Sequence, residues 1–261
     1  MNKILGRKQN IFNEDWLEAV RKIEELVTKK ELDVRIKATI SEIKEKTKGK
    51  NAAYSWSAGK DSIVLGKICE KAGIKQCVLV RSNLEYAAFT DWIEKNKPDG
   101  LTVINTGQDI EWLAKHPQML FPADSKIASQ WFHIVQHRGQ AKYYKDKKLD
   151  MLLLGRRRAD GNYVGKGDNI YTNNDGITRY SPLADWTHEE ILAYIHYYKC
   201  ELPPIYEWPN GYLCGTHSWP ARQWTGGIMN GWREVYQIEP KILEEASKYF
   251  PEAKDVLDGK E

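Results

Sequence analysis

The sequence has no long apolar run, no cysteines spaced for a metal site and no strong excess of charge of either sign. No stretch approaches the roughly 18 to 20 apolar residues that a membrane-spanning helix needs. The N-terminal residues 1–8 are too short and too weakly apolar for a signal peptide. We therefore expect a cytoplasmic globular protein without a membrane segment, and its 41% hydrophobic and 29% charged residues fit that class.

The four cysteines are scattered along the chain, at Cys69, Cys77, Cys200 and Cys214. Because no Cys-x-x-Cys spacing occurs, we expect neither an iron–sulfur cluster nor a zinc site, and reduced thiols instead. The 39 basic and 36 acidic residues leave a net charge of only +3. That balance argues against nucleic-acid binding by this chain alone.

Residues 57–62 read Ser-Ala-Gly-Lys-Asp-Ser, between a short apolar segment and the apolar run that starts at Ile63. Such a turn from a strand into a helix N-terminus binds phosphate, because unpaired N–H groups and a partial positive charge gather there. Gly59 lets the backbone approach an oxyanion, Lys60 adds a full charge, and two serines add hydroxyl donors. The turn is not a Walker A loop, because the glycine spacing is absent. The chain is therefore predicted to bind a nucleotide.

Apolar segments at 77–80, 101–104 and 149–154 alternate with helical stretches. This alternation predicts an α/β fold with a doubly wound, mostly parallel sheet, which we expect to have five strands. Asp175-Gly176 between two short apolar pairs predicts a hairpin, and Thr187-His-Glu-Glu190 predicts a capped helix over 191–198. Ser57, Ser82 and the segment 155–160 each come after the carboxyl end of a predicted strand. Ligands bind at these ends in parallel sheets, so we expect these residues to lie at the binding site.

Three parts are expected to form one compact unit: an N-terminal helical extension (1–48), a nucleotide-binding core (49–200) and a C-terminal segment (201–261). Apolar spacings of three and four predict two amphipathic helices, over 13–28 and 34–43, and a further helical segment over 241–257. Between about 202 and 232, large aromatic residues alternate with proline and glycine, which predicts mostly turns. This aromatic stretch, with Trp208, Trp219, Trp224 and Trp232, is a candidate lid, protein-partner surface or packing segment.

The turn at 57–62 resembles the Ser-Gly-Gly-Lys-Asp-Ser PP-loop of the adenine nucleotide alpha-hydrolase superfamily. Ala58 stands where that family usually has glycine, and a methyl group is tolerated there if the residue keeps a negative φ. The resemblance implies ATP as ligand, contacted by Ser57, Ala58, Gly59, Lys60, Asp61 and Ser62. It also implies Mg²⁺ held partly by Asp61.

Residues 155–160, Gly-Arg-Arg-Arg-Ala-Asp, resemble the Gly-x-Arg-Arg-x-Asp segment of FAD synthetases and the Gly-x-Arg-x-x-Glu segment of phosphoadenosine phosphosulfate (PAPS) reductases. Guanidinium groups suit phosphate and sulfate oxyanions. The match implies nucleotide contacts from Gly155, Arg157, Arg158 and Asp160. The segments at 181–186, 202–206 and 211–212 also resemble the PAPS reductase branch, so the resemblance covers about 50–225.

Two departures from the PAPS reductases matter. Those enzymes carry a nucleophilic cysteine in a C-terminal Glu-Cys-Gly-x-His segment, whereas this chain has no cysteine after Cys214. Cys214, with His217 nearby in sequence, matches an internal loop, so it is expected to line the site, and a nucleophilic role stays open. The segment that begins at Ser82 also differs from the family's Asp-Thr-Gly, which leaves its adenosine contacts open.

We therefore expect a PP-loop ATP pyrophosphatase that cleaves between the α and β phosphates and adenylates a substrate, with Lys60, Asp61 and Arg157 as catalytic residues. A reductase-like frame without the redox cysteine implies sulfur transfer, for example the ATP pyrophosphatase component of DNA phosphorothioation systems. The alternatives are a PAPS reductase acting through Cys214, an FAD synthetase-like adenylyltransferase, and a non-catalytic nucleotide-binding subunit that docks partners through the aromatic stretch.

Overall fold

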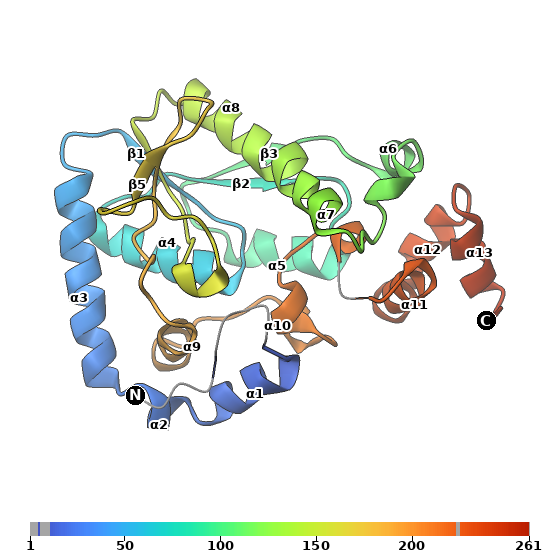
Figure 1. The fold of residues 1–261 in the computed structure, drawn as a ribbon, viewed down its shortest axis with the longest axis horizontal. Helices are drawn as coiled ribbons and strands as arrows, with labels where there is room; N and C mark the ends of the chain where they lie inside the picture. Colours follow the sequence, from blue (N-terminus) through green and yellow to red (C-terminus); the bar gives the residue numbers. More distant parts are fainter. Residues whose placement is uncertain (1–4, 6–10, 223–224, 261) are drawn as a thin grey trace. The chain divides into compact units, whose positions relative to one another are not determined.

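The computed structural model describes residue 5, residues 11–222 and residues 225–260 (Figure 1). Its centre is a six-stranded sheet in the order β3-β2-β1-β4-β6-β5. The strands are β1 (Ala52–Ser55), β2 (Cys77–Arg81), β3 (Leu101–Asn105), β4 (Met151–Leu153), β5 (Ile170–Thr172) and β6 (Thr178–Tyr180).

The predicted α/β fold with a mostly parallel sheet is confirmed. Strand β1 pairs in parallel with β2 and β4, and β4 pairs in parallel with β6. The predicted hairpin is present as the antiparallel pair β5–β6, and both of its strands join the sheet. The sheet therefore has six strands rather than the expected five.

The chain divides into two compact units. The first contains the described residues up to Leu79, together with Lys97–Val103 and Gln140–Pro203. Its helices are α1 (Asn13–Arg21), α2 (Ile23–Leu26), α3 (Lys29–Lys46), α4 (Lys60–Ala72), most of α8 (Arg138–Asp146) and α9 (His188–Tyr197). The second contains Val80–Asn96, Ile104–Gly139 and the described residues from Pro204 onward. Its helices are α5 (Ala87–Asn96), α6 (Ile110–Ala114), α7 (Ser125–Trp131), a π-helix (Phe132–His137), α10 (Gly211–Cys214), α11 (Ile228–Ile238), α12 (Pro240–Ala246) and α13 (Pro251–Leu257).

In the first unit, helices α4 and α8 pack on opposite faces of β1. Gln140 of α8 donates a hydrogen bond to the Ser55 hydroxyl at 3.0 Å, whereas the ring of the preceding residue, Tyr54, lies against Gly66 of α4. Successive side chains of a strand point to opposite faces. The two contacts therefore place one helix layer on each side of the sheet.

The N-terminal helices differ in their bounds from the prediction. The segment 13–28 forms two helices, α1 and α2, which meet at Lys22. Helix α3 starts at Lys29, well before residue 34, because Thr28 and Glu31 form a reciprocal capping box. The Thr-x-x-Glu pattern is visible in the sequence and is the signal that the prediction overlooked.

The aromatic stretch contains more helix than the turns predicted for it, because α11 begins at Ile228. Trp219 and Trp232 are 2% and 0% exposed, and their ring centroids lie 5.5 Å apart. Of the three roles that the sequence left open, lid, partner surface and packing segment, these two residues therefore have the packing role. Trp224 lies outside the described residues. The predicted helical segment 241–257 is divided into α12 and α13, since Pro251 starts a new helix.

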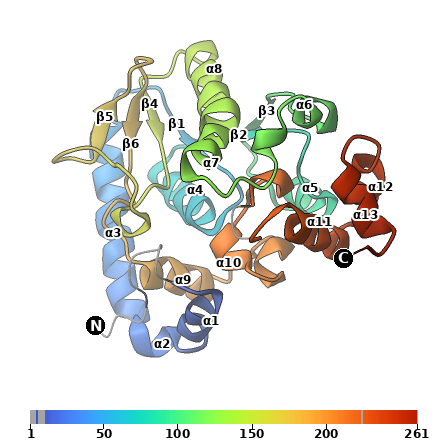
Figure 2. The ribbon, with the colours of Figure 1, turned by 45° about the vertical axis from the view of Figure 1, so that its right-hand side comes forward.

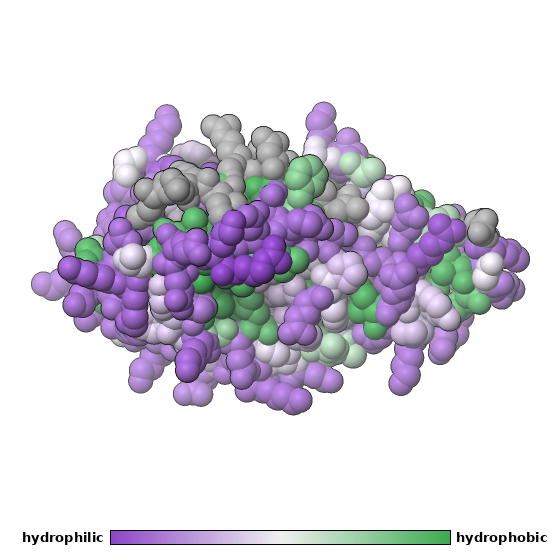
Figure 3. All heavy atoms as spheres, turned by 90° about the horizontal axis from the view of Figure 1, so that it is seen from below, coloured by the Kyte–Doolittle hydropathy of each residue, from purple (hydrophilic) through white to green (hydrophobic). Residues whose placement is uncertain are grey.

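Among the described residues, none of the helices combines the length and the apolar character needed to cross a membrane. Hydrophilic residues predominate on the face drawn in Figure 3.

Candidate functional site

The turn from β1 into α4 is fixed by its own hydrogen bonds. The Ser57 N–H donates to the Ser62 hydroxyl at 3.0 Å, and that hydroxyl lies 2.9 Å from the Gly59 carbonyl, to which it donates. Gly59, with extended backbone angles, caps the N-terminus of α4. In this arrangement, Ser62 shapes the turn at the helix end where the sequence predicts a phosphate.

Ala58 has φ of +56°, so the negative φ on which its tolerance depended is not found. The residue is also fully buried. The left-handed region is strained for any residue with a Cβ atom, by roughly 1 to 2 kcal/mol. Glycine, the usual residue of the family at this position, adopts a positive φ without strain. Alanine adopts it here at some cost in the stability of the fold.

Lys60 is turned into the protein. Its ammonium Nζ lies 2.7 Å from Asp61 Oδ2 and 4.9 Å from the centre of the Trp16 ring, and the residue is only 5% exposed. A cation beside a carboxylate and over an indole face is stabilised by both contacts. Helix α1 therefore covers the lysine of the PP-loop through Trp16.

Arg157 lies at the centre of the cluster and is fully buried. Its Nε is 2.9 Å from Asp61 Oδ1, an ion pair in which the N–H does not point along the hydrogen-bond direction. Its Nη2 lies 3.1 Å from Asp160 Oδ1 and 3.1 Å from His188 Nδ1, and Nη1 donates to the Trp186 carbonyl at 3.4 Å. Arg157 thereby ties the start of α4 to the loop after β4.

The three consecutive arginines have different surroundings. Arg158 is exposed, pairs with Asp185 and donates to Asn169 Oδ1 at 2.7 Å. Arg156 is half-buried, and its Nη1 donates to the Tyr171 hydroxyl at 2.9 Å. Arg157, one of the two arginines that the resemblance implies as nucleotide contacts, forms an ion pair with Asp61 at the start of α4.

Gly155 is needed for this close approach. A Cβ atom at Gly155 would lie 3.3 Å from the backbone carbon and oxygen of Asp61, tighter than ordinary contact. The start of α4 and the loop after β4 therefore touch through backbone, and Gly155 is the residue that permits it.

Trp16 and His188 are site residues that the sequence reasoning missed. Their ring centroids are 4.7 Å apart, edge to face, and His188 is 1% exposed. His188 follows the helix cap Thr187, so its place at the start of α9 was predictable. Its contact with Arg157 joins residues far apart in sequence, and no local pattern signals such a contact.

Asp61, the residue predicted to hold Mg²⁺ in part, lies between two cations. Its two carboxylate oxygens already lie 2.7 Å from Lys60 Nζ and 2.9 Å from Arg157 Nε. Among the described residues, no group of three or more His, Cys, Asp or Glu side chains could hold a metal ion. Asp61 is thus the anion that joins the two cations, and its predicted contact with Mg²⁺ stays a prediction, because Mg²⁺ is commonly held by one or two carboxylates together with substrate phosphates.

Ser82 and Cys214 belong to the second unit. Ser82 is buried, and its N–H and hydroxyl donate to Glu85 Oε1 at 3.2 and 3.0 Å. Burial raises the pKa of Glu85 to about 7. Cys214 ends the short helix α10 and is 2% exposed.

The other three thiols are less acidic than a free cysteine. Burial raises the pKa of Cys69 well above its ordinary value, the pKa of Cys77 to about 11, and the pKa of Cys200. A thiol whose pKa is raised is a poor nucleophile at neutral pH.

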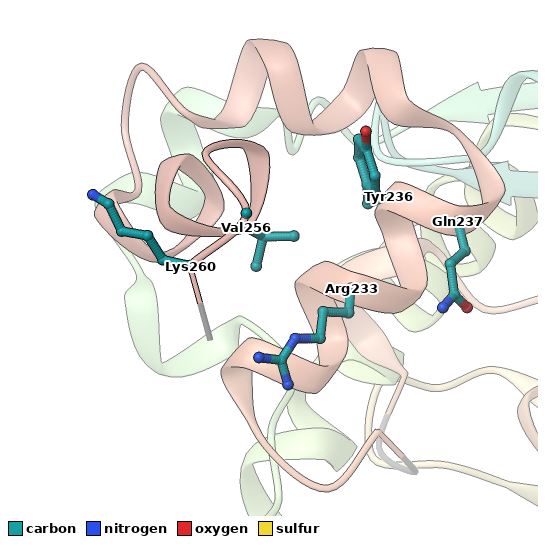
Figure 4. A pocket seen from close by; sticks show the side chains of 6 residues that line it. Arg233, Tyr236, Gln237, Val256 and Lys260 are labelled. Atoms are coloured by element: carbon teal, nitrogen blue, oxygen red, sulfur yellow. The ribbon is translucent and has the colours of Figure 1, made fainter.

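The second unit also contains a hollow of about 540 Å³ (Figure 4). It is lined by Arg233, Tyr236, Gln237, Val256, Gly259 and Lys260. None of the residues predicted from the sequence to bind nucleotide lines it.

Residues 51–212 match the family model described as phosphoadenosine phosphosulfate reductase domain. A phosphoadenosine phosphosulfate reductase of Emericella nidulans is 28% identical over 99 residues, which are 38% of this chain. The match spans only 30% of that relative.

The solved structures that resemble the chain include a reductase and a synthetase. A PAPS reductase from Candida auris, in a phosphate complex, has a TM-score of 0.51 and 16% identity, over 69% of this chain and 92% of that one. An NMN synthetase from Francisella tularensis has a TM-score of 0.45 and 16% identity, over 88% and 87% of the two chains. At 16% identity, the similarity to the Candida auris structure shows the fold alone.

Proposed function

Because the chain belongs to the phosphoadenosine phosphosulfate reductase domain family, we propose that it is a PP-loop enzyme that uses ATP. It cleaves ATP between the α and β phosphates and transfers the adenylyl group to an acceptor. The observation that carries the proposal is the turn from β1 into α4, where Lys60 and Asp61 join Arg157 at the carboxyl ends of two parallel strands.

The reaction needs charge compensation at the leaving group. The bond between Pα and its bridging oxygen breaks, the electron pair leaves with pyrophosphate, and a new bond forms between Pα and a nucleophilic atom of the acceptor. The N–H groups at the start of α4 and the Lys60 ammonium are the groups suited to stabilise pyrophosphate. Lys60 has to leave Asp61 and Trp16 to reach it.

Arg157 acts in this proposal as a positioning residue. It is fully buried and contacts Asp61, Asp160, His188 and the Trp186 carbonyl. It holds Asp61, and Asp61 holds Lys60, so that the ammonium stays beside the turn until a phosphate replaces the carboxylate as its partner.

The burial of Cys214 favours adenylyl transfer over sulfonucleotide reduction. Reduction through a protein thiol requires an accessible thiolate, whereas Cys214 is 2% exposed. For the acceptor we propose the sulfur-transfer class, of which DNA phosphorothioation is an example, because residues 51–212 match the domain of a sulfonucleotide reductase and Cys214 is buried.

The test compares pyrophosphate release and ATP affinity in three proteins: wild type, Lys60→Ala and Lys67→Ala. Lys67 is an exposed lysine of the same helix, paired with Glu70 at 3.7 Å, and serves as the matched control. We expect Lys60→Ala to lose pyrophosphate release and to bind ATP at least tenfold more weakly, by loss of a charge-assisted contact, with Lys67→Ala unchanged. Equal activity of wild type and Lys60→Ala refutes the proposal.

Added substrates separate the alternatives. Turnover of PAPS with thioredoxin, abolished by Cys214→Ala, would indicate a reductase. Formation of FAD from ATP and FMN would indicate an FAD synthetase-like enzyme. ATP binding without any product would indicate a nucleotide-binding subunit.

A further inference from the structure

Two lysine-rich turns meet at the amino ends of strands β1 and β4. Helix α3 ends at Lys46 and α8 ends at Asp146, and each helix is followed by a short turn into its strand. Figure 2 shows the two helices on either side of these strands. Because β1 and β4 are parallel neighbours whose first residues lie opposite each other, the turns 47–51 and 147–150 lie together at one edge of the sheet.

The two turns are fixed to each other by Asn51. Its side-chain amide donates to the carbonyls of Lys147 and Lys148 at 2.9 and 3.1 Å, and its Oδ1 accepts from Gln76 Nε2 at 2.6 Å. The Asn51 N–H donates to Asp150 Oδ2 at 2.8 Å. Lys148 is held with φ of +50°, in the left-handed region that is strained for a residue with a Cβ atom. The turns therefore form one fixed surface.

Positive charge is concentrated at this edge. Residues 44–50 and 142–150 contain eight lysines and three acidic residues, a net charge of +5, whereas the whole chain has +3. Two of these lysines, Lys46 and Lys142, pair with acidic side chains four residues away. The other six are exposed and form no ion pair within the part of the chain that the structure describes. Five of the six lie at the turns and are called the lysine surface here: Lys48, Lys50, Lys145, Lys147 and Lys148.

The helix dipoles explain only part of this arrangement. A lysine near the C-terminus of a helix is stabilised by the dipole, but the effect fades beyond the last turn. Only Lys145 lies within a helix, whereas the other four members of the lysine surface lie beyond the ends of α3 and α8. Like charges gathered on one surface repel one another, and a partner with several negative charges removes that cost.

We propose that the lysine surface binds the phosphate backbone of a nucleic acid. Contacts between lysines and phosphates give binding that does not depend on base sequence, and they release counterions from the nucleic acid. Five exposed cations spread over two turns suit a row of phosphates. A small anionic molecule would instead need a concave site with converging polar groups.

The composition of this edge favours a nucleic acid over an acidic protein or a membrane. Protein interfaces depend on aromatic or apolar anchors, and stable membrane binding needs an apolar face or a lipid chain in addition to basic residues. Among the described residues, none of the exposed large hydrophobic side chains lies within 44–51 or 142–150. Charge is therefore the main means of recognition that the lysine surface offers.

The lysine surface and the PP-loop lie at opposite ends of β1. The four residues of that strand alone separate them by roughly 13 Å. The surface would therefore dock a nucleic acid without contacting the reacting phosphates, and the proposal does not depend on the reaction proposed for ATP. The expectation that this chain does not bind nucleic acid alone was based on its net charge, an average that conceals a local surface.

Anisotropy of a fluorescently labelled DNA duplex of about 20 base pairs, titrated with the full chain without ATP at about 50 and about 200 mM salt, tests the proposal. The lysine-surface variant carries glutamine at Lys48, Lys50, Lys147 and Lys148, and it keeps the backbone carbonyls that Asn51 binds. The control has the same net charge, because it carries glutamine at four exposed lysines elsewhere: Lys30, Lys95, Lys241 and Lys254.

We expect the wild type to bind the duplex more weakly as the salt concentration rises. The lysine-surface variant should bind about tenfold or more weakly at the lower salt concentration. Its slope of log affinity against log salt should be smaller by about 3 to 4, because each phosphate contact contributes about 0.9. The control should keep the wild-type slope. Equal losses in the two variants, or no binding by the wild type at the lower salt concentration, overturn the proposal.

Further ligands and a milder variant complete the test. An RNA duplex of the same length distinguishes the two nucleic acids, and binding of either duplex through the lysine surface supports the proposal. Tighter binding of poly-glutamate or of phosphatidylserine vesicles than of both duplexes overturns it. If the fourfold variant unfolds, the double variant Lys48→Gln with Lys147→Gln replaces it and should lower the slope by about 2; an unchanged slope contradicts the proposed surface.

Discussion

Asp61 Oδ1 lies 2.9 Å from Arg157 Nε, and this ion pair joins the N-terminus of α4 to the loop that follows β4. Both residues lie at the carboxyl ends of neighbouring parallel strands, β1 and β4. The pair sets the shape of the candidate site, because the same carboxylate also contacts Lys60 and the same guanidinium contacts Asp160 and His188.

Replacement of Arg157 by methionine should destabilise the protein strongly. It would leave Asp61 and Asp160 close together without their shared cation, and breaking a buried pair from one side costs about 3 to 5 kcal/mol. Equilibrium unfolding in urea measures the loss. The control is Arg158→Met, which removes the exposed partner of Asp185 and should cost less than about 1 kcal/mol. Similar losses in the two variants would contradict the central position given to Arg157.

Trp16→Leu should increase the affinity for ATP. Lys60 has to leave the Trp16 ring to reach a phosphate, and a cation–π contact is worth about 0.5 to 2 kcal/mol. Its removal should therefore tighten ATP binding by roughly 2- to 30-fold, as measured by titration calorimetry. Leu17→Ala, at a partly exposed position of the same helix, is the control. Weaker binding by Trp16→Leu would mean that Trp16 supports the site rather than covering it.

Ala58 should tolerate glycine and reject a β-branched residue. In Ala58→Gly, relief of about 1 to 2 kcal/mol of left-handed strain offsets the loss of one buried methyl, about 0.8 kcal/mol, and the extra chain entropy of glycine. Ala58→Val adds both strain and volume at a fully buried position and should cost more than about 2 kcal/mol. Denaturant titration of both variants checks this, and an Ala58→Val variant as stable as wild type would be inconsistent with the positive φ.

Glu85 should make the stability depend on pH. Its pKa is raised from 4.5 to about 7 by burial, so the folded state binds more protons than the unfolded state between these values. Stability therefore falls as pH rises through this window, and the penalty is complete above pH 7. Glu85→Gln keeps the acceptor for Ser82 and should match the wild type at pH 4.5 but exceed it by about 3 kcal/mol at pH 8. Parallel pH profiles of the two proteins would rule this out.

Much of the candidate site could be predicted because its parts directly follow strands. Residues 57–62 and 155–160 each combine a strand end with glycine and charge, and the parallel sheet brings them together. Trp16 could not be predicted as a site residue, since apolar spacing shows that a helix is amphipathic but not what it covers.

The sequence predicted the α/β class of the fold but not the number of strands in its sheet. The hairpin at Asp175-Gly176 was recognisable from its turn residues, but that both strands join the main sheet depends on long-range pairing. The left-handed conformation of Ala58 had no signal either, because alanine does not mark a positive φ as glycine does.

The proposed function depends on cleavage of ATP between the α and β phosphates. Its most direct test is incubation of the purified protein with ATP labelled at the γ phosphate, Mg²⁺ and candidate acceptors, followed by separation of the labelled products. We predict that the label appears in pyrophosphate and that this product disappears in Lys60→Ala. Label in inorganic phosphate, with ADP as the other product, would rule out cleavage between the α and β phosphates.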